Sequence, residues 1–255
     1  MTESWIQVGD GNTVWADDTG GDRPPILLLH PGVGDSRIWE PILPELRDRH
    51  RVIRFDTRGY GRSPAATAPF SMLADTITVM DHYGLGRTPI VGCSQGGGVA
   101  CGLAVDHPDR VSALVLLCPG IPGYEIDEDP AVEAEMEKAW AAGPDALAEL
   151  GLRLWARAGR TPEVVEQLRS GARGWLSEEE YAQPDPPVFD RLTEIAVPSS
   201  LLVGDLDRDW LIKSARLAAA AIPGCVLVEV AGVDHLPPLR VPDRVLELIT
   251  ATVPA

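Results

Sequence analysis

The sequence lacks several features that membrane proteins and nucleic-acid-binding proteins need. It has no run approaching the roughly 20 apolar residues that span a bilayer. Its first residues, Met1 to Trp5, carry neither a basic patch nor a long apolar stretch, so we expect no secretory signal. The net charge of −16 argues against a basic face that would bind nucleic acid or an anionic membrane. We therefore predict a soluble cytoplasmic protein whose partner is a small molecule.

Lysine and cysteine are both scarce. Only Lys138 and Lys213 are lysine among the 22 basic residues, and with abundant Ala, Pro, Gly and Asp this bias suggests a GC-rich bacterial coding sequence. Cysteine occurs at Cys93, Cys101, Cys118 and Cys225. These positions show no metal-ligand spacing such as Cys-x-x-Cys, and three lie within or beside expected buried elements. We interpret them as reduced, small apolar side chains in a cytoplasmic protein.

Short apolar runs alternate with helical patterns along most of the chain, which at 255 residues is long enough to bury a large core. Residues 5–8 and 12–17 indicate an antiparallel hairpin. Residues 25–29 and 52–55 are typical of strands buried on both faces of a parallel sheet. Further strands are expected at residues 113–117, 199–203 and 225–230 and in the run that ends at Val91. Helices are expected at residues 38–48, from the N-cap Ser71 to Gly84, and at residues 97–107, 213–221 and beyond Pro242.

From about Pro119 this alternation stops. Residues 128–183 contain helical patterns only, and alternation returns after the proline-rich spacer at residues 184–187. The pattern predicts a parallel α/β sheet interrupted by a helical insertion. The expected division is into a first core part, an inserted helical cap and a second core part, at residues 1–120, 121–187 and 188–255.

The insertion has three further features. Glycine and proline are expected to separate its helices, at residues 143–144, 159–162 and 171–174. Residues 125–137 carry seven acidic side chains, which we interpret as a solvated helix face. Several large apolar residues share a helix face, and we expect them to pack the insertion onto the main domain, with one or two also lining a pocket. They are Trp140, Leu147, Leu150, Leu154 and Trp155.

Five residues between an expected strand and an expected helix carry most of the chemical information. They read Gly92-Cys93-Ser94-Gln95-Gly96. A serine at a sharp strand-to-helix turn adopts a strained backbone, and side chains two residues to either side would collide there. Glycine at both positions removes the clash and leaves the serine oxygen pointing up from the sheet edge. The pentad alone leaves open an ordinary serine in a glycine-rich turn.

A serine nucleophile needs a histidine to take its proton and an acid to orient that histidine. Of the five histidines, His235 is the best candidate. It lies in a loop directly after the last expected strand, where open α/β sheets place their sites. The acid is expected among Asp205, Asp207 and Asp209, which follow the preceding strand in the same way.

Spaced aspartates can also hold calcium. An EF-hand that began at Asp205 would need glycine at position 210 and glutamate at position 216. The sequence has Trp210 and Arg216 instead. We therefore interpret one of the aspartates as an orienting acid.

Taken together, these motifs resemble the α/β-hydrolase fold superfamily, in its lidded serine esterase and enol-lactonase-like branch. The likeness covers nearly the whole chain and is weakest in the insertion. It implies a mostly parallel eight-stranded sheet flanked by helices, with a helical cap. The motifs that carry it are His-Pro-Gly at residues 30–32, the turn at 56–63, which we interpret as structural, the pentad, and residues 204–207 and 232–235.

The order serine, acid, histidine is also that of the superfamily. By this resemblance Ser94 is the nucleophile, Asp207 the acid and His235 the base. Some relatives carry the acid one strand earlier, where residues 118–120 of this chain hold no carboxylate. That difference favours Asp207, and Asp205 is then expected to serve its turn.

The resemblance also implies an oxyanion hole made of the backbone N–H groups of Gln95 and Gly32. Such donors stabilise charge that appears only in the transition state, and losing one typically costs about 3–4 kcal/mol. Pro31 stands where relatives usually have glycine, and it has no N–H to donate. No cofactor and no metal are expected.

The implied function is a serine hydrolase that cleaves a small carboxylic ester or lactone through an acyl-enzyme on Ser94. The same three residues could instead act on a thioester, a carbon–carbon bond or an N-terminal peptide bond, or in acyl transfer. Small-ligand receptors of this fold are a third, non-enzymatic hypothesis. Relatives that open epoxides or remove halogens use aspartate as the nucleophile, so serine disfavours those activities.

Overall fold

An eight-stranded sheet forms the centre of the computed structural model, which describes residues 2–9 and 11–253. The strands follow the order β1-β2-β4-β3-β5-β6-β7-β8. β1 pairs antiparallel with β2 and β2 with β4, and the remaining pairs are parallel. The sheet expected from the sequence is therefore confirmed. The strands are β1 (Thr2–Val8), β2 (Asn12–Asp18), β3 (Pro25–Leu29), β4 (Arg51–Phe55), β5 (Thr88–Cys93), β6 (Val111–Leu117), β7 (Ser199–Gly204) and β8 (Val226–Val230).

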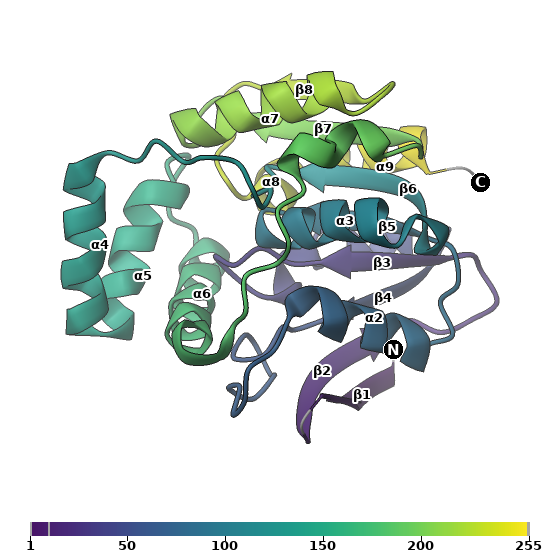
Figure 1. Cartoon of the computed structure of the whole chain (residues 1–255), viewed down its shortest axis with the longest axis horizontal. Coiled ribbons are helices and arrows are strands. Elements are labelled where there is room, and N and C mark those ends of the chain that lie inside the picture. Colours follow the sequence, from purple (N-terminus) through teal and green to yellow (C-terminus); the bar gives the residue numbers. More distant parts are fainter. Residues whose placement is uncertain (1, 10, 254–255) are drawn as a thin grey trace.

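Helices flank both faces of the sheet (Figure 1). Side chains alternate between the faces of a strand, so β3 sends Leu27 and Leu29 into one apolar cluster and Ile26 and Leu28 into another. The first cluster includes side chains of α2 (Met72–His82), α3 (Gln95–Asp106) and α7 (Asp209–Ala221). The second includes side chains of α1 (Leu43–Leu46), α8 (Pro237–Arg240) and α9 (Pro242–Thr252). The described residues also form three short 3-10 helices, η1 (Ser36–Trp39), η2 (Pro108–Arg110) and η3 (Phe189–Glu194).

Three more helices lie beyond the carboxyl ends of the parallel strands (Figure 1). They are α4 (Pro130–Ala142), α5 (Pro144–Trp155) and α6 (Pro162–Tyr181). Leu147, Leu150 and Leu154 of α5 are buried in a small apolar cluster shared among these helices. Their burial agrees with the expected apolar face, although this cluster holds the three helices to one another. Among the described residues, no helix combines the length and apolar content needed to cross a membrane.

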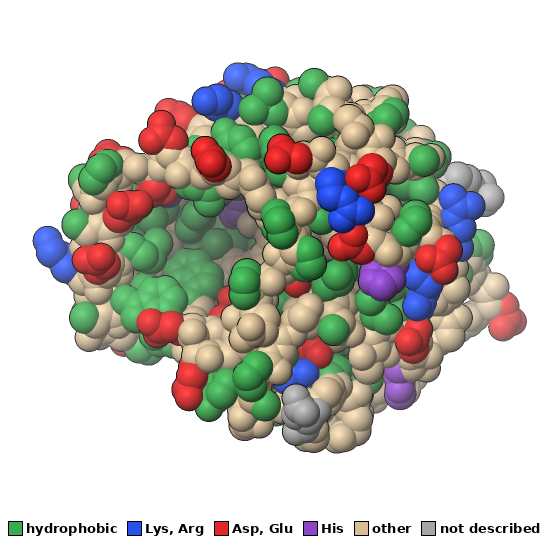
Figure 2. All heavy atoms as spheres, in the orientation of Figure 1, with side chains coloured by type: hydrophobic (Ala, Val, Ile, Leu, Met, Phe, Trp, Pro, Cys, Tyr) green, Lys and Arg blue, Asp and Glu red, His purple; other side chains and the backbone are tan. Residues whose placement is uncertain are grey.

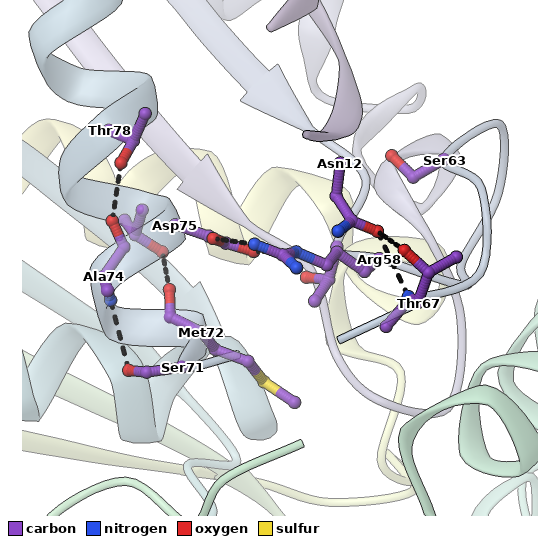
Figure 3. Close-up of polar contacts among 12 residues, drawn as sticks. Asn12, Arg58, Ser63, Thr67, Ser71, Met72, Ala74, Asp75 and Thr78 are labelled. Carbon is purple, nitrogen blue, oxygen red and sulfur yellow. Dashed lines mark hydrogen bonds and ion pairs between the residues drawn. The ribbon is translucent and has the colours of Figure 1, made fainter. Parts of the chain in front are cut away.

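The turn that follows β4 is anchored by polar contacts (Figure 3). Arg58 donates two hydrogen bonds to the carboxylate of Asp75 on α2, at 2.7 and 2.8 Å, and both side chains are buried. The hydroxyl of Ser71 accepts the backbone N–H of Ala74, which confirms Ser71 as the N-cap of α2. The contact between Arg58 and Asp75 agrees with a structural role for residues 56–63.

Two details of the expected helices are wrong. Residues 38–48 do not form one helix, because Pro41 and Pro44 lack the N–H that a helix interior needs. The segment instead forms η1 and α1, with an irregular turn between them. The glycines at residues 171–174 do not separate helices either, since α6 runs through them without a break.

Close packing explains the glycines of α6. A Cβ atom added at Gly171 would lie 2.6 Å from the backbone carbon of Val33, and one at Gly174 would lie 2.1 Å from the ring of Tyr60. Glycine therefore lets α6 approach the loop after β3 and the turn after β4. The sequence pattern showed the glycines but not the surfaces that α6 approaches.

We expect Gly171→Ala to lower the free energy of unfolding by about 1–3 kcal/mol, the usual cost of overpacking a well-packed site. Its Cβ would meet backbone, which cannot move aside as a flexible side chain can. Gly102→Ala in α3 is the matched control, because its Cβ would make an ordinary 3.6 Å contact with Leu73. Alanine is also the better helix former, so the control should be neutral or stabilising. Urea unfolding of both variants checks this, and equal stabilities would contradict the packing explanation.

Candidate active site

Ser94 occupies the sharp turn between β5 and α3, with backbone angles φ 49° and ψ −113°. Among the described residues, only Ser94 and Cys118 are non-glycine residues with positive φ. A Cβ added at Gly92 would lie 2.3 Å from the carbonyl oxygen of Gly96, and one at Gly96 would lie 2.4 Å from that of Leu29. The two glycines therefore permit a turn that any other residue would block, as the pentad predicted.

The side chains of Ser94, His235 and Asp207 meet at this turn. His235 Nε2 lies 2.7 Å from Ser94 Oγ, and His235 Nδ1 lies 2.7 Å from Asp207 Oδ2. Asp207 follows β7, and His235 follows β8, so the loops after two neighbouring strands bring them together. The side chains of His235 and Asp207 are 1% and 0% exposed. With Nδ1–H donated to the carboxylate, Nε2 is free to accept the serine proton.

The neighbouring aspartates serve the loops. Asp205 accepts the backbone N–H of Gly232 at 2.6 Å and so ties the loop after β7 to the loop after β8. Asp234 accepts the N–H of Leu236 and forms a 2.7 Å ion pair with Arg240. Neither carboxylate contacts His235, and the turn role expected for Asp205 agrees with its contact.

His30, the other histidine at a strand end, is buried and hydrogen-bonds to the turn after β4 instead of to the serine. Its Nε2 accepts the backbone N–H of Thr57 at 2.9 Å, and its ring lies 5.2 Å from that of Tyr60. These contacts join the end of β3 to the turn after β4. His30 therefore positions the loop that carries Gly32, the glycine named as an oxyanion donor.

The backbone N–H groups of Gly32 and Gln95 have no protein acceptor among the described residues. Both residues line the same cavity as Ser94. A Cβ added at Gly32 would lie 3.2 Å from Gln95 Oε1, so the two residues are close neighbours. The two amides are thus available to a ligand beside the serine.

Trp155 at the end of α5 packs against the imidazole, a contact that sequence reasoning missed. Its ring centroid lies 4.4 Å from that of His235, and its backbone carbonyl oxygen accepts a hydrogen bond from the backbone N–H of His235 at 3.3 Å. The spacing of apolar residues placed Trp155 on a packing face. Nothing in that spacing indicated which histidine it would meet, because the two residues approach only through the tertiary fold.

Glu178 of α6 is a second residue that the sequence did not single out. Gln95 Nε2 donates to its carboxylate, at 3.1 and 3.2 Å from the two oxygens. The fully buried hydroxyl of Tyr60 lies against the same carboxylate. Burial raises the pKa of Glu178 to about 7, although these neighbouring donors act in the opposite direction. Glu178 therefore links the inserted helices to the residue that follows Ser94.

Because the folded-state pKa of Glu178 is raised, the folded protein keeps a proton that the unfolded chain loses between about pH 4.5 and 7. The stability that this group contributes is complete below that window and declines as pH rises through it. We therefore expect the difference in unfolding free energy between Glu178→Gln and wild type to grow in favour of the variant from pH 5 to pH 8. Urea unfolding at both pH values measures it, with the exposed Glu180→Gln as the control. A pH-independent difference would contradict this assignment.

A cavity of about 1370 Å³ opens above Ser94, between the inserted helices and the carboxyl edge of the sheet. Figure 2 shows this hollow, with hydrophobic side chains inside it and Asp and Glu side chains around its rim. Trp140 and Trp155 both line it, as expected for one or two of the large apolar residues of the insertion. The serine is therefore accessible from a large, mostly apolar chamber.

Among the described residues, one group of side chains has the spacing of a metal site, Cys118, Asp207 and His235. Its possible ligand atoms lie within 4.8 Å of one another, and all three residues are buried. A metal there would have to replace the hydrogen bond between the carboxylate and the imidazole. The donor set therefore suits a proton relay better than a cation.

Comparison with known proteins gives consistent results. A sequence model described as α/β hydrolase fold matches residues 24–150. A putative carbamate hydrolase, RutD, of Caulobacter segnis is 30% identical over 86% of this chain and 77% of its own length. The structure of a protein described as an N-acyl homoserine lactone degrading enzyme has a TM-score of 0.82 and 26% identity, covering 98% of this chain and 100% of that one. The enol-lactonase from Burkholderia xenovorans has a TM-score of 0.80 and 25% identity, with the same coverage.

Proposed function

Because this chain belongs to the α/β-hydrolase fold family, we propose that it is a serine hydrolase that cleaves a small carboxylic ester or lactone. The observation that carries the proposal is the hydrogen-bonded series from Ser94 through His235 to Asp207, with both distances at 2.7 Å. Such a series activates a hydroxyl that is otherwise a very weak nucleophile. The similar lactone-degrading enzyme and enol-lactonase support a lactone or ester as the substrate.

In the first half of the reaction, Ser94 Oγ attacks the carbonyl carbon of the substrate, and its proton passes to His235 Nε2. Asp207 accepts the Nδ1–H of the imidazole and stabilises the imidazolium that forms. The carbonyl oxygen becomes an oxyanion and accepts hydrogen bonds from the backbone N–H groups of Gln95 and Gly32. His235 then donates the proton to the departing alkoxide, which leaves an acyl group on Ser94.

In the second half, a water molecule attacks the acyl carbonyl carbon while His235 Nε2 takes its proton. The same two amides stabilise the second oxyanion. When this intermediate collapses, the bond to Ser94 breaks, the proton returns to Oγ, and the acid is released. A lactone follows the same steps, except that its alkoxide stays attached to the acyl chain until hydrolysis frees the hydroxy acid.

The helical insertion at residues 121–187 is, in this proposal, the cap of the active site. Two contacts support it, the packing of Trp155 on His235 and the hydrogen bond between Gln95 and Glu178. Both join the insertion to catalytic residues or to their direct neighbours. The cap would therefore shape the substrate pocket and also hold the imidazole in place.

Acyl-enzyme formation on Ser94 tests the proposal directly. With a short p-nitrophenyl ester, we expect a burst of p-nitrophenol equivalent to the enzyme, followed by slower turnover. A fluorophosphonate probe should label one residue, and peptide mass spectrometry should find the adduct on Ser94. Failure of both measurements would reject the proposal. Labelling without turnover of esters or lactones would favour a thioester, a carbon–carbon bond, acyl transfer or a receptor.

A further inference from the structure

Among the described residues that line the active-site cavity there are several carboxylates but no arginine or lysine. Five glutamates line it, and His235 is the one lining residue that can take a positive charge. They are Glu128, Glu133, Glu137, Glu178 and Glu179. Walls of one sign focus the electrostatic potential inside a cleft and concentrate ligands of opposite charge. The electrostatic potential of the cavity therefore disfavours binding of an anionic group and favours binding of a cation.

Most of these carboxylates are not neutralised by the protein. Glu128 forms an ion pair with Arg208, but none of the other four forms an ion pair with a described arginine or lysine. Glu179 accepts a hydrogen bond from Trp140 Nε1 at 2.6 Å, and Glu178 accepts from Gln95. These neutral donors stabilise a carboxylate without cancelling its charge. The pKa of Glu178 is raised because its carboxyl group is half-buried and no cation lies beside it to stabilise the charged form.

Aromatic rings are concentrated in the same cavity. Only 5% of the chain is aromatic, and four of its seven tryptophans line this space together with one tyrosine. They are Tyr124, Trp140, Trp155, Trp175 and Trp210. Tryptophan faces attract cations, and quaternary ammonium groups are bound by such cages. The chain already uses one ring in this way, because the Arg208 guanidinium lies 5.4 Å from the centroid of Trp155.

The aromatic and acidic groups begin next to the reacting serine and extend to α4. Glu178 contacts Gln95, the neighbour of Ser94, and Trp155 packs on His235. Glu133 and Glu137 lie on α4, on the far side of the same space. A substrate whose carbonyl lies at Ser94 would therefore hold the rest of its length among tryptophan faces and carboxylates.

We propose that the natural substrate is an ester or lactone that carries a cationic group, an ammonium or quaternary ammonium, bound by the tryptophans and glutamates of this cavity. This inference rests on the proposed function and names the substrate class of the same site. It separates this chain from hydrolases that act on carboxylate-bearing substrates. An anionic substrate of equal size would meet three exposed glutamates that have no basic partner among the described residues, and Glu178 would add a partial negative charge near pH 7.

Two matched pairs of esters, which differ only in charge, test the inference. In the first, choline butyrate is compared with 3,3-dimethylbutyl butyrate, where carbon replaces the quaternary nitrogen. In the second, the p-nitrophenyl ester of 4-(trimethylammonio)butyric acid is compared with that of 5,5-dimethylhexanoic acid. We expect kcat/KM of the cationic ester to exceed that of its neutral partner by about tenfold in at least one pair. The p-nitrophenyl hemiester of glutaric acid should be slower than either acyl ester.

Charge variants of the rim give a second readout. The double variant Glu133→Gln, Glu137→Gln should reduce the cationic-to-neutral ratio of kcat/KM several-fold, and added salt should reduce it in wild type. A ratio is insensitive to a general loss of active enzyme. Glu180→Gln, an exposed residue of α6 outside the cavity, is the control and should leave the ratio unchanged. An unchanged ratio in the double variant would place the cation elsewhere and overturn the inference.

Protection of Ser94 gives a result even if none of these esters is a substrate. Choline should slow fluorophosphonate labelling at concentrations where 3,3-dimethylbutanol does not. Equal protection by the two alcohols, or hydrolysis of neutral or anionic esters in preference to cationic ones, overturns the inference while the proposed function stands. If Ser94 is not labelled and no ester is hydrolysed, the proposed function itself fails.

Discussion

Alanine in place of Ser94 is expected to lower kcat for a short p-nitrophenyl ester by roughly 10⁶-fold, the loss typical when a serine nucleophile is removed. His235 Nε2 would then have no hydroxyl to deprotonate, and no acyl group could form at this position. The two backbone amides and the cavity remain, so a small rate above that of water should persist. Steady-state kinetics over several hours of incubation measure the difference.

The fold should not change in this variant. Alanine keeps the Cβ that the strained turn already accommodates, so its Tm should stay close to that of wild type. Ser71→Ala is the opposite control, because losing the cap of α2 should cost about 1 kcal/mol of stability while kcat is kept. Turnover by Ser94→Ala within tenfold of wild type would mean that another group is the nucleophile.

Asparagine in place of Asp207 is expected to lower kcat by about 10⁴-fold. The amide can donate a hydrogen bond to His235 Nδ1, which places the imidazole proton on Nε2. Nε2 can then no longer accept the serine proton. The shape of the side chain is unchanged, so the loss should lie in kcat far more than in KM. The kcat and KM of the purified variant for the same p-nitrophenyl ester check this.

Asp205→Asn is the matched control, two residues earlier in the same loop. Asp205 contacts the N–H of Gly232 and not the imidazole, and an asparagine oxygen can accept the same hydrogen bond. We therefore expect kcat within a few-fold of wild type. If Asp205→Asn lost the activity and Asp207→Asn kept it, the orienting acid would be the other carboxylate.

The sheet could be read from the sequence because its strands are buried on both faces. The run at residues 25–29 is continuously apolar and coincides with β3, and the expected hairpin at residues 5–8 and 12–17 forms from β1 and β2. The ends of the helices were harder to predict. Residues 38–48 have a helical pattern, but Pro41 and Pro44 divide them, and local backbone chemistry overrides periodicity there.

The glycines at residues 171–174 show the opposite failure. In isolation they look like a break, because glycine weakens a helix. In the fold they let α6 approach the backbone of the loop after β3, and tertiary packing offsets the weaker helical preference. The same set of contacts brings Glu178 to Gln95. These two residues are 83 positions apart, and sequence spacing does not indicate a contact over that separation.

By itself, the sequence determined the strained turn around Ser94, because Gly92 removes a clash with the carbonyl of Gly96, only four residues along the chain. It also determined that Asp207 and His235 follow consecutive strands, whose carboxyl ends parallel pairing brings to one edge of the sheet. Only the tertiary structure decided how the insertion meets that edge. Four tryptophans and five glutamates come from segments whose order along the chain says nothing of a shared cavity. The physical reason is the distance along the sequence over which each interaction acts. The hydrophobic pattern of a strand and the strain of a turn depend on residues close in sequence, whereas a pocket is formed by surfaces that meet only when the chain has folded.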